Sequence, residues 1–410
     1  MYRVWYSTET FADYIIESTI LSERRVCKAQ MCESDASKPK MFHRTPDHIR
    51  KILYLDAPDI IVEKNNEPIF SIEISTEAGT GHNSFQRFAR IAASAENGVP
   101  CIYIYPEGVV VNRQENQSGW DTINPQIFRA MESVMSIYQI PVLLFYYPSY
   151  LNTHANTVQN IPSSSHKGLK QDARIQYSSC PDSTDSNMKK MFGVINTIIN
   201  AVEEASLSSV INKLEIRQQR QWMQSEFCTK LGTRDAETLS PLSATIEIPT
   251  IYLLNYLSQY EENGYTLGEL LASRETTLIY QANAKFRGDP YPGSLAAIDY
   301  MECREGKTFE ERGKNLVLLF GSIQIDHENQ IIQIIDEKGS TITDFCQEVK
   351  KSEKHNLLGR DYSSLKGYEI PRYFMQVRYG STYSKVKHIR VYSYFADAIL
   401  FPDGALWRDA

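Results

Sequence analysis

The sequence predicts an α/β protein whose N-terminal part contains a mixed central sheet flanked by helices. Residues 59–63 and 69–76 form two apolar segments with strand character, and the short polar turn 64–68 between them is rich in asparagine, which is typical of a hairpin. Two segments of helical periodicity then alternate with two short apolar strands, in the order 84–96, 101–105, 124–138 and 140–147. Strands that alternate with helices indicate an α/β fold.

Composition and charge are those of a soluble globular protein. The chain has 410 residues, of which 42% are hydrophobic and 23% charged, and its formal net charge is −7. No apolar run approaches the ~18 residues that a membrane span needs, and the N-terminus lacks the layout of a signal peptide. The seven cysteines are scattered without a Cys-x-x-Cys pair, so neither a zinc site nor a disulfide framework is expected. We therefore expect a cytoplasmic protein that contacts no membrane.

Helix start and stop signals place three helices around the predicted hairpin. Residues 7–22 are expected to form the first, and Thr45-Pro46-Asp47 begins the second, because proline is favoured in the first turn of a helix. The third helix covers 84–96 and ends at Asn97-Gly98. Its expected buried stripe consists of Phe85, Phe88, Ile91 and Ala92.

The predicted hairpin carries two carboxylates of interest. Asp59 opens the first strand and can lie across from Glu73 on the second. Side chains alternate along a strand. One face of the second strand is therefore expected to carry Ile69, Ser71, Glu73, Ser75 and Glu77. A carboxylate in an apolar strand is costly unless its charge has a partner, and a divalent cation is a common one. An ordinary amphipathic hairpin with its polar face in water also fits these residues.

Pro58-Asp59, thirteen intervening residues and Glu73-Ile74-Ser75, followed by a helix and another strand, resemble the PD-(D/E)XK nuclease superfamily. The run GHNSFQRFARIAASAENGVPCIYIYP is similar to segments of type II restriction endonucleases within that superfamily. The resemblance covers residues 45–147, and it implies a restriction-endonuclease-like core.

The resemblance also implies a reaction and a cofactor. A protein of this kind hydrolyses phosphodiester bonds of double-stranded DNA at specific sequences, and Mg2+ would be held by Asp59, Glu73 and the backbone oxygen of Ile74. Hard oxygen ligands suit Mg2+, which lowers the pKa of a bound water and neutralises charge on the leaving oxygen. Cutting both strands implies a two-fold homodimer.

Ser75 departs from the family pattern, which places a lysine at this position. A serine is uncharged and cannot stabilise an anionic transition state as an ammonium would. Three replacements are open. Glu77 could add a second carboxylate ligand, and Gln86, Arg87 or Arg90 could reach in from the following helix. His82, just before that helix, could orient a water or a phosphate. We take Glu77 and Gln86, with Asp59 and Glu73, as the catalytic candidates. A catalytically decayed DNA-binding or assembly module remains open, as does a nuclease of a repair pathway or of another defence pathway.

Beyond the predicted nuclease core (1–151) the composition of the sequence changes. Residues 152–188 are rich in Ser, Asn, Thr and Asp, and we expect a polar linker or long loop there. Residues 189–410 are expected to form a C-terminal mixed α/β region that recognises DNA or mediates dimerisation. It begins with a long helix or helix pair at 189–227 and contains strands with a hairpin at 315–335.

A positively charged stretch lies near the C-terminus. Ile370–Ala396 contains five lysines and arginines and neither Asp nor Glu, with tyrosines interleaved. Basic side chains bind phosphates, and aromatic ones can approach bases. The expected DNA-binding residues are Arg87, Arg90, Arg378, Lys385, Lys387 and Arg390. A packed hairpin with incidental charges also fits this stretch.

Overall fold

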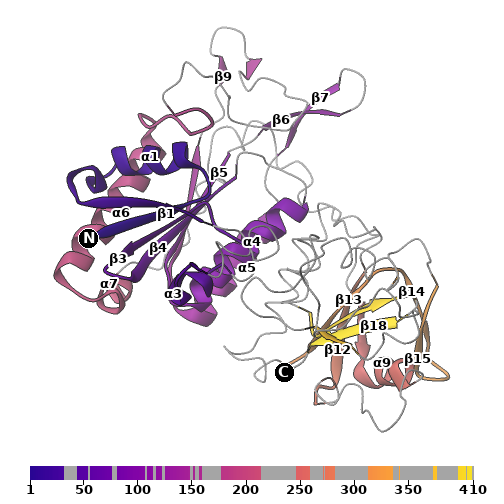
Figure 1. Cartoon of the computed structure of the whole chain (residues 1–410). Helices are drawn as coiled ribbons and strands as arrows, with labels where there is room; N and C mark the ends of the chain where they lie inside the picture. The colour runs from indigo at the N-terminus through magenta and orange to yellow at the C-terminus, as the bar shows by residue number, and fades with distance from the viewer. Residues whose placement is uncertain are drawn as a thin grey trace.

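The computed structural model contains two six-stranded sheets, which are built from different parts of the chain (Figure 1). It describes residues 1–31, 44–53, 56–75, 81–106, 109–113, 117–121, 125–147, 151–152, 157–158, 177–213, 246–258, 271, 273–281, 313–335, 341, 373–375, 396–402 and 404–408. Helices flank the first sheet, and smaller two-stranded sheets accompany both parts. The predicted α/β class is confirmed.

The first sheet is mixed, as the sequence predicts. Its strands, in spatial order, are β2 (Val26–Gln30), β1 (Tyr2–Tyr6), β3 (Ile60–Lys64), β4 (Glu67–Ile74), β5 (Cys101–Pro106) and β8 (Val142–Tyr147). The pairs β1–β2, β4–β5 and β5–β8 are parallel, whereas β1–β3 and β3–β4 are antiparallel. Strands β1 and β2 were not predicted from the sequence.

The predicted hairpin is present as β3 and β4. Asn65 and Asn66 form its turn with positive φ angles of 52° and 70°. Asparagine tolerates this left-handed region better than most residues, which explains why two of them close the hairpin. Because Ile60 pairs with Ile72, Asp59 and Glu73 face each other at the open end of the hairpin.

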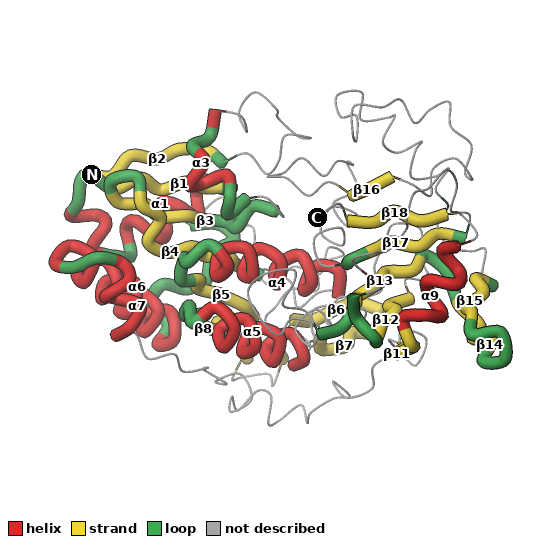
Figure 2. Tube along the Cα trace, turned by 90° about the horizontal axis from the view of Figure 1, so that it is seen from below, coloured by secondary structure: helices red, strands yellow, loops and turns green. Residues whose placement is uncertain are grey.

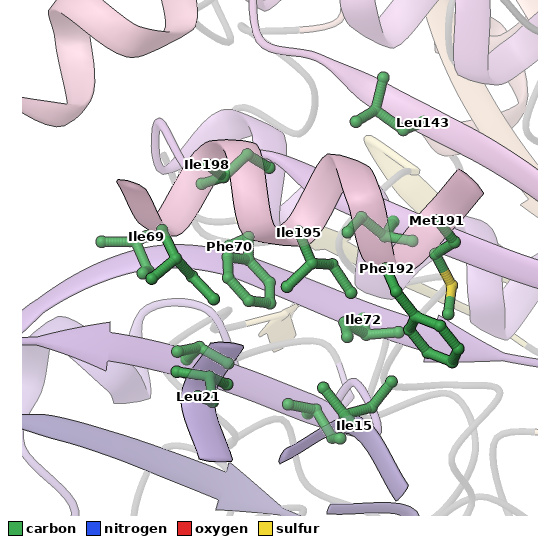
Figure 3. Packing of buried hydrophobic residues seen from close by; sticks show 14 of the residues in the cluster. Ile15, Leu21, Ile69, Phe70, Ile72, Leu143, Met191, Phe192, Ile195 and Ile198 are labelled. Atoms are coloured by element: carbon green, nitrogen blue, oxygen red, sulfur yellow. The ribbon is translucent and has the colours of Figure 1, made fainter. Parts of the chain in front are cut away.

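The face predicted for Ile69 is wrong. The register shifts between Val62 and Glu63, which leaves Ile69 without a directly paired residue on β3. Ile69 packs into the same apolar cluster as Phe70 instead of sharing the face of Ser71 and Glu73 (Figure 3). An irregularity of this kind changes the side-chain alternation locally.

The helices of the first part are short apart from three. They are α1 (Glu9–Glu17), the 3-10 helix η1 (Ile20–Glu23), α3 (Asp47–Arg50), α4 (Gly81–Glu96), α5 (Pro125–Tyr138), α6 (Ser186–Glu204) and α7 (Leu207–Lys213). Helix α4 begins three residues before the predicted start, and α4 and α5 lie side by side (Figure 2). Of the predicted stripe, Phe88, Ile91 and Ala92 are buried. Among the described residues, we find no helix with the length and apolar character to cross a membrane.

Helices α1 and α6 cover one face of the first sheet. Ile195 of α6 packs with Phe70 and Ile72 of β4 in one apolar cluster (Figure 3). The other face packs against α3 and α4. On the side of α3, Trp5, Ile49 and Ile61 form a smaller cluster. Helices α6 and α7 therefore belong to the core of the first sheet, which differs from the prediction of a linker end and a C-terminal region for these residues.

Short strand pairs extend the chain after β5 and β8. They are β6 (Val109–Arg113) with β7 (Gln117–Asp121), and β9 (Leu151–Asn152) with β10 (Thr157–Val158), both antiparallel. Neither pair was predicted from the sequence. Strands β9 and β10 fall at the end of the predicted core and inside the predicted linker.

The second sheet is also mixed. Its strands, in spatial order, are β11 (Ile246–Pro249), β12 (Thr276–Gln281), β13 (Asn315–Leu319), β17 (Ala398–Phe401), β18 (Gly404–Arg408) and β16 (Tyr373–Met375). Helix α9 (Thr250–Leu257) packs beside the hairpin of β14 (Ile323–Asp326) and β15 (Ile331–Ile334). The predicted hairpin at 315–335 is thus confirmed, with its first strand divided into β13 and β14.

We predict that Ile195→Ala, on the core face of α6, lowers the free energy of unfolding by about 2–5 kcal/mol, because it leaves a cavity against β4. Ile195 is fully buried, whereas Ile251 of α9 is 47% exposed. Ile251→Ala is therefore the matched control and should change stability by less than about 1 kcal/mol. Thermal and urea unfolding of both variants measure this; equal losses would contradict the packing of α6 on the first sheet.

Candidate active site

The three predicted metal-ligand positions meet at the open end of the β3–β4 hairpin. Asp59 lies just before β3, and its Oδ2 accepts a hydrogen bond of 2.9 Å from the backbone N–H of Ile74. Ile74 ends β4, and Glu73 precedes it. The carboxylate of Asp59 is thus fixed beside Glu73 and the backbone of Ile74, as the sequence predicts for a pair on opposite strands.

The end of β1 holds the segment that carries Asp59. The backbone N–H of Ser7 donates to the backbone oxygen of Asp59 at 2.9 Å, and the Ser7 hydroxyl donates to the backbone oxygen of Pro58 at 3.1 Å. Asp59 itself is half-buried. Its position therefore depends on backbone contacts with the end of β1. These contacts could not be predicted without β1.

Glu73 is a fully buried carboxylate with unequal surroundings for its two oxygens. Its Oε1 accepts a hydrogen bond of 2.6 Å from Nη1 of Arg90, and Nε of Arg87 lies 3.6 Å from the same oxygen. Its Oε2 is buried and has no hydrogen-bond partner among the described residues. Burial raises the pKa of Glu73 to about 8, and the nearby charge of Asp59 adds to this rise, whereas Arg90 and Arg87 oppose it.

Arg90 joins Glu73 to a second buried carboxylate, Asp56. The Nε and Nη2 atoms of Arg90 donate to Oδ2 of Asp56 at 3.1 and 2.8 Å, while Nη1 binds Glu73. Burial alone lowers the pKa of Arg90, but Asp56, Glu73 and Asp59 outweigh it and hold that pKa well above its usual value. Asp56 was missed in the sequence. The available signal was an acid inside an apolar segment, three residues before Asp59.

Glu63 shows what a fully paired buried carboxylate looks like in the same sheet. Its Oε1 accepts from Nη1 of Arg3 at 2.8 Å, and its Oε2 lies 2.7 Å from Nε2 of His48. Both oxygens of Glu63 therefore have partners, which ties β1 and α3 to β3. Glu73 differs, because one of its oxygens lacks a hydrogen-bond partner within the described part of the chain. An unpaired buried carboxylate oxygen is costly and favours an added cation or donor.

Ser75 is buried and contacts the hydroxyl groups of two tyrosines. It is 1% exposed, its Oγ hydrogen-bonds the Tyr103 hydroxyl at 2.8 Å, and the Tyr147 hydroxyl donates to its backbone oxygen at 2.9 Å. Burial raises the pKa of Tyr103 to about 12, so this phenol stays protonated at neutral pH. The position at which the resemblance places a lysine thus carries neutral hydroxyl groups.

The other predicted site residues divide into two groups. Arg87 and Arg90, expected to bind DNA, both lie against Glu73, and the Arg90 side chain is only 14% exposed. Arg90 therefore belongs to the carboxylate cluster. Outside the described residues or side chains lie Glu77, Gln86, Arg378, Lys385, Lys387 and Arg390.

The arrangement of Asp59, Glu73 and Ile74 fits one hard divalent cation. Asp59 and Glu73 each present a carboxylate oxygen that makes none of the hydrogen bonds above, and backbone oxygens are further ligands for Mg2+, which keeps several waters. No cluster of three or more His, Cys, Asp or Glu side chains suited to a metal occurs in the part of the chain that the structure describes. A cation here would therefore depend on two side chains, the backbone and water.

Comparison of this chain with protein-family models, with curated proteins and with solved structures gives no match. The function of the site must therefore be inferred from its residues and from the sequence motif.

We predict that the stability of the protein without divalent cations falls as pH rises between about 5 and 8, and that Glu73→Gln flattens this dependence. Folding raises the pKa of Glu73 from 4.5 to about 8. In this window the unfolded chain therefore loses a proton that the folded protein retains, which costs up to about 1.4 kcal/mol per pH unit. Thermal unfolding at several pH values measures it. Glu9→Gln, at a side chain 59% exposed, is the control and should leave the wild-type profile unchanged; a wild-type profile parallel to that of Glu73→Gln would contradict the shifted pKa.

Proposed function

We propose that this protein is a Mg2+-dependent endonuclease of double-stranded DNA, with Asp59, Glu73 and the backbone oxygen of Ile74 as cation ligands. The buried Oε2 of Glu73, which lacks a hydrogen-bond partner among the described residues and lies across the hairpin from Asp59, is the observation that carries this proposal. The resemblance of Pro58-Asp59 and Glu73-Ile74-Ser75 to the PD-(D/E)XK superfamily supports the reaction class.

In the proposed enzyme, the residues of the site would have different roles. Bound Mg2+ would supply an acidified water and neutralise charge on the leaving oxygen. Asp59 is oriented for binding by the N–H of Ile74, and Glu73 is held through its other oxygen by Arg90. Arg87 lies 3.6 Å from Glu73, with 15% of its side chain exposed. In the proposed enzyme, it contributes positive charge beside the phosphate, which the missing lysine would otherwise supply.

The finer parts of the proposal rest on the resemblance and on the sequence alone. We propose that cleavage is sequence-specific, that a homodimer cuts both strands, and that the protein acts in the cytoplasm as a restriction enzyme. The basic stretch Ile370–Ala396 is proposed to bind the DNA backbone. A nuclease of a repair pathway or of another defence pathway would use the same site and would differ only in its substrate preference.

A second candidate function is a DNA-binding or assembly module without catalysis. It is favoured by Ser75, whose side chain is closed in by Tyr103 and carries no charge. This candidate predicts DNA binding without hydrolysis, and it predicts that substitutions of Asp59 and Glu73 leave DNA affinity nearly unchanged.

We predict that the purified protein cuts phage and mixed-sequence plasmid DNA into discrete fragments when Mg2+ is present, and that EDTA abolishes cutting. Asp59→Asn and Glu73→Gln should each reduce the rate by more than the 10–100-fold that is typical for loss of an outer partner of a metal site. Asp13→Asn is the matched control, because Asp13 lies on α1 outside the site and pairs with Lys28 of β2. Gel analysis of the fragments, with mapping of their ends, gives the rate, the sequence and the stagger.

Other outcomes separate the candidates. Fragments that persist in both site variants would indicate a contaminating nuclease and contradict the proposal. A shift of DNA on a native gel with no cutting over a range of salt and divalent metals would favour the non-catalytic candidate. Random nicking instead of discrete fragments would support the proposed nuclease activity and contradict its sequence specificity.

A further inference from the structure

Asp56 is a fully buried acid that the proposed reaction does not use. It lies in the segment that leads into β3, and its side chain is 0% exposed. Its Oδ1 accepts from the backbone N–H of Ala57 at 3.0 Å, and its Oδ2 accepts both Nε and Nη2 of Arg90. A buried charge of this kind persists only with a well-oriented partner. One charged partner of Asp56 is thus the arginine that also binds Glu73.

The three nitrogens of Arg90 are divided between the two acids. The guanidinium is planar and rigid, so binding Asp56 with Nε and Nη2 fixes the direction in which Nη1 points. Nη1 then meets Oε1 of Glu73 at 2.6 Å. Because one oxygen of Glu73 is held in this way, the other is held in place as well. That other oxygen, Oε2, has no hydrogen-bond partner in the described part of the chain.

We propose that Asp56 is a positioning residue of the cation site. Acting through Arg90, it orients Oε2 of Glu73 toward the cation. It also shares the positive charge of Arg90, so that this charge does not act on Glu73 alone. Without the charge of Asp56, the guanidinium would neutralise Glu73 more fully and would repel a divalent cation. The inference deepens the proposed function and rests on it, because it concerns the same cation.

The experiment measures cation binding without DNA. Mn2+, which takes the same hard oxygen ligands as Mg2+, is titrated into the full-length protein, and the free ion is followed by electron paramagnetic resonance; competition with Mg2+ gives the affinity for the second ion. Asp56→Asn should weaken the affinity by about 10–100-fold, as removal of an outer partner of a metal site typically does. The matched control Asp13→Asn removes one surface carboxylate and should bind as the wild type does.

A second variant tests the route through Arg90. Arg90→Lys keeps the positive charge but replaces the fork with one ammonium, which cannot bind both acids in the same way. It should weaken the affinity to a similar degree. In the Arg90→Lys background, Asp56→Asn should add less than about threefold, because residues that act through one contact are not additive. An equal cost in both backgrounds would mean that Asp56 acts by itself, and would overturn the inference.

The remaining outcomes distinguish this inference from the proposed function. Wild-type protein that binds no Mn2+ would remove the cation site and with it both proposals. Wild-type binding with unchanged affinity in Asp56→Asn would overturn only the role of Asp56. Circular dichroism and thermal unfolding show whether each variant folds. If Asp56→Asn does not fold, Arg90→Lys decides, and wild-type affinity in that variant overturns the inference.

Discussion

The ion pairs between Arg90 and the two buried acids Asp56 and Glu73 constrain the whole N-terminal site. Both acids are 0% exposed, and removing a charge from water costs several kcal/mol unless good partners replace the solvent. One guanidinium contributes to this for both acids. The segment before β3, the strand β4 and the helix α4 are therefore joined through Arg90, and separating any of them breaks its contacts with Asp56 or Glu73.

The spacing of the contacts explains how α4 settles on β4. Ser71 and Glu73 are two residues apart on the strand, a rise of about 6.6 Å, and Ser94 and Arg90 are four apart on the helix, a rise of about 6 Å. The two rises nearly match, so an antiparallel helix keeps both contacts at once. The Ser71 and Ser94 hydroxyls are 2.9 Å apart, and Arg90 binds Glu73 one turn earlier. Local periodicity thus determines the register of helix on strand.

The hairpin could be predicted from sequence because its causes are local. Asn65 and Asn66 supply the turn. The position of Asp59 opposite Glu73 also depends on the register shift between Val62 and Glu63, because the register of Lys64 with Glu67 alone would place Ile72 opposite Asp59. The acid at Asp56 could be noticed in its apolar segment, but its contact with Arg90 could not be predicted, because Arg90 lies 34 residues away and the contact exists only after α4 docks. For the same reason the sequence did not distinguish an arginine that binds buried acids from one that binds DNA. Likewise, the apolar stripe of α6 indicates burial but not which sheet it covers.

The position of Ser75 shows where the positive charge of the site comes from. In the register of β4 and β5, Glu73 pairs with Tyr103, whose hydroxyl then reaches Ser75. A lysine at this point would have to bury an ammonium in a space that the tyrosine fills, and burying a charge is costly unless good partners replace the solvent. The cations near Glu73 instead come from α4, as Arg87 and Arg90. Because these arginines stand three apart on one helix, they share a face. The positive charge beside Glu73 therefore lies on α4, and the packing of α4 decides how close this charge comes to the buried acids.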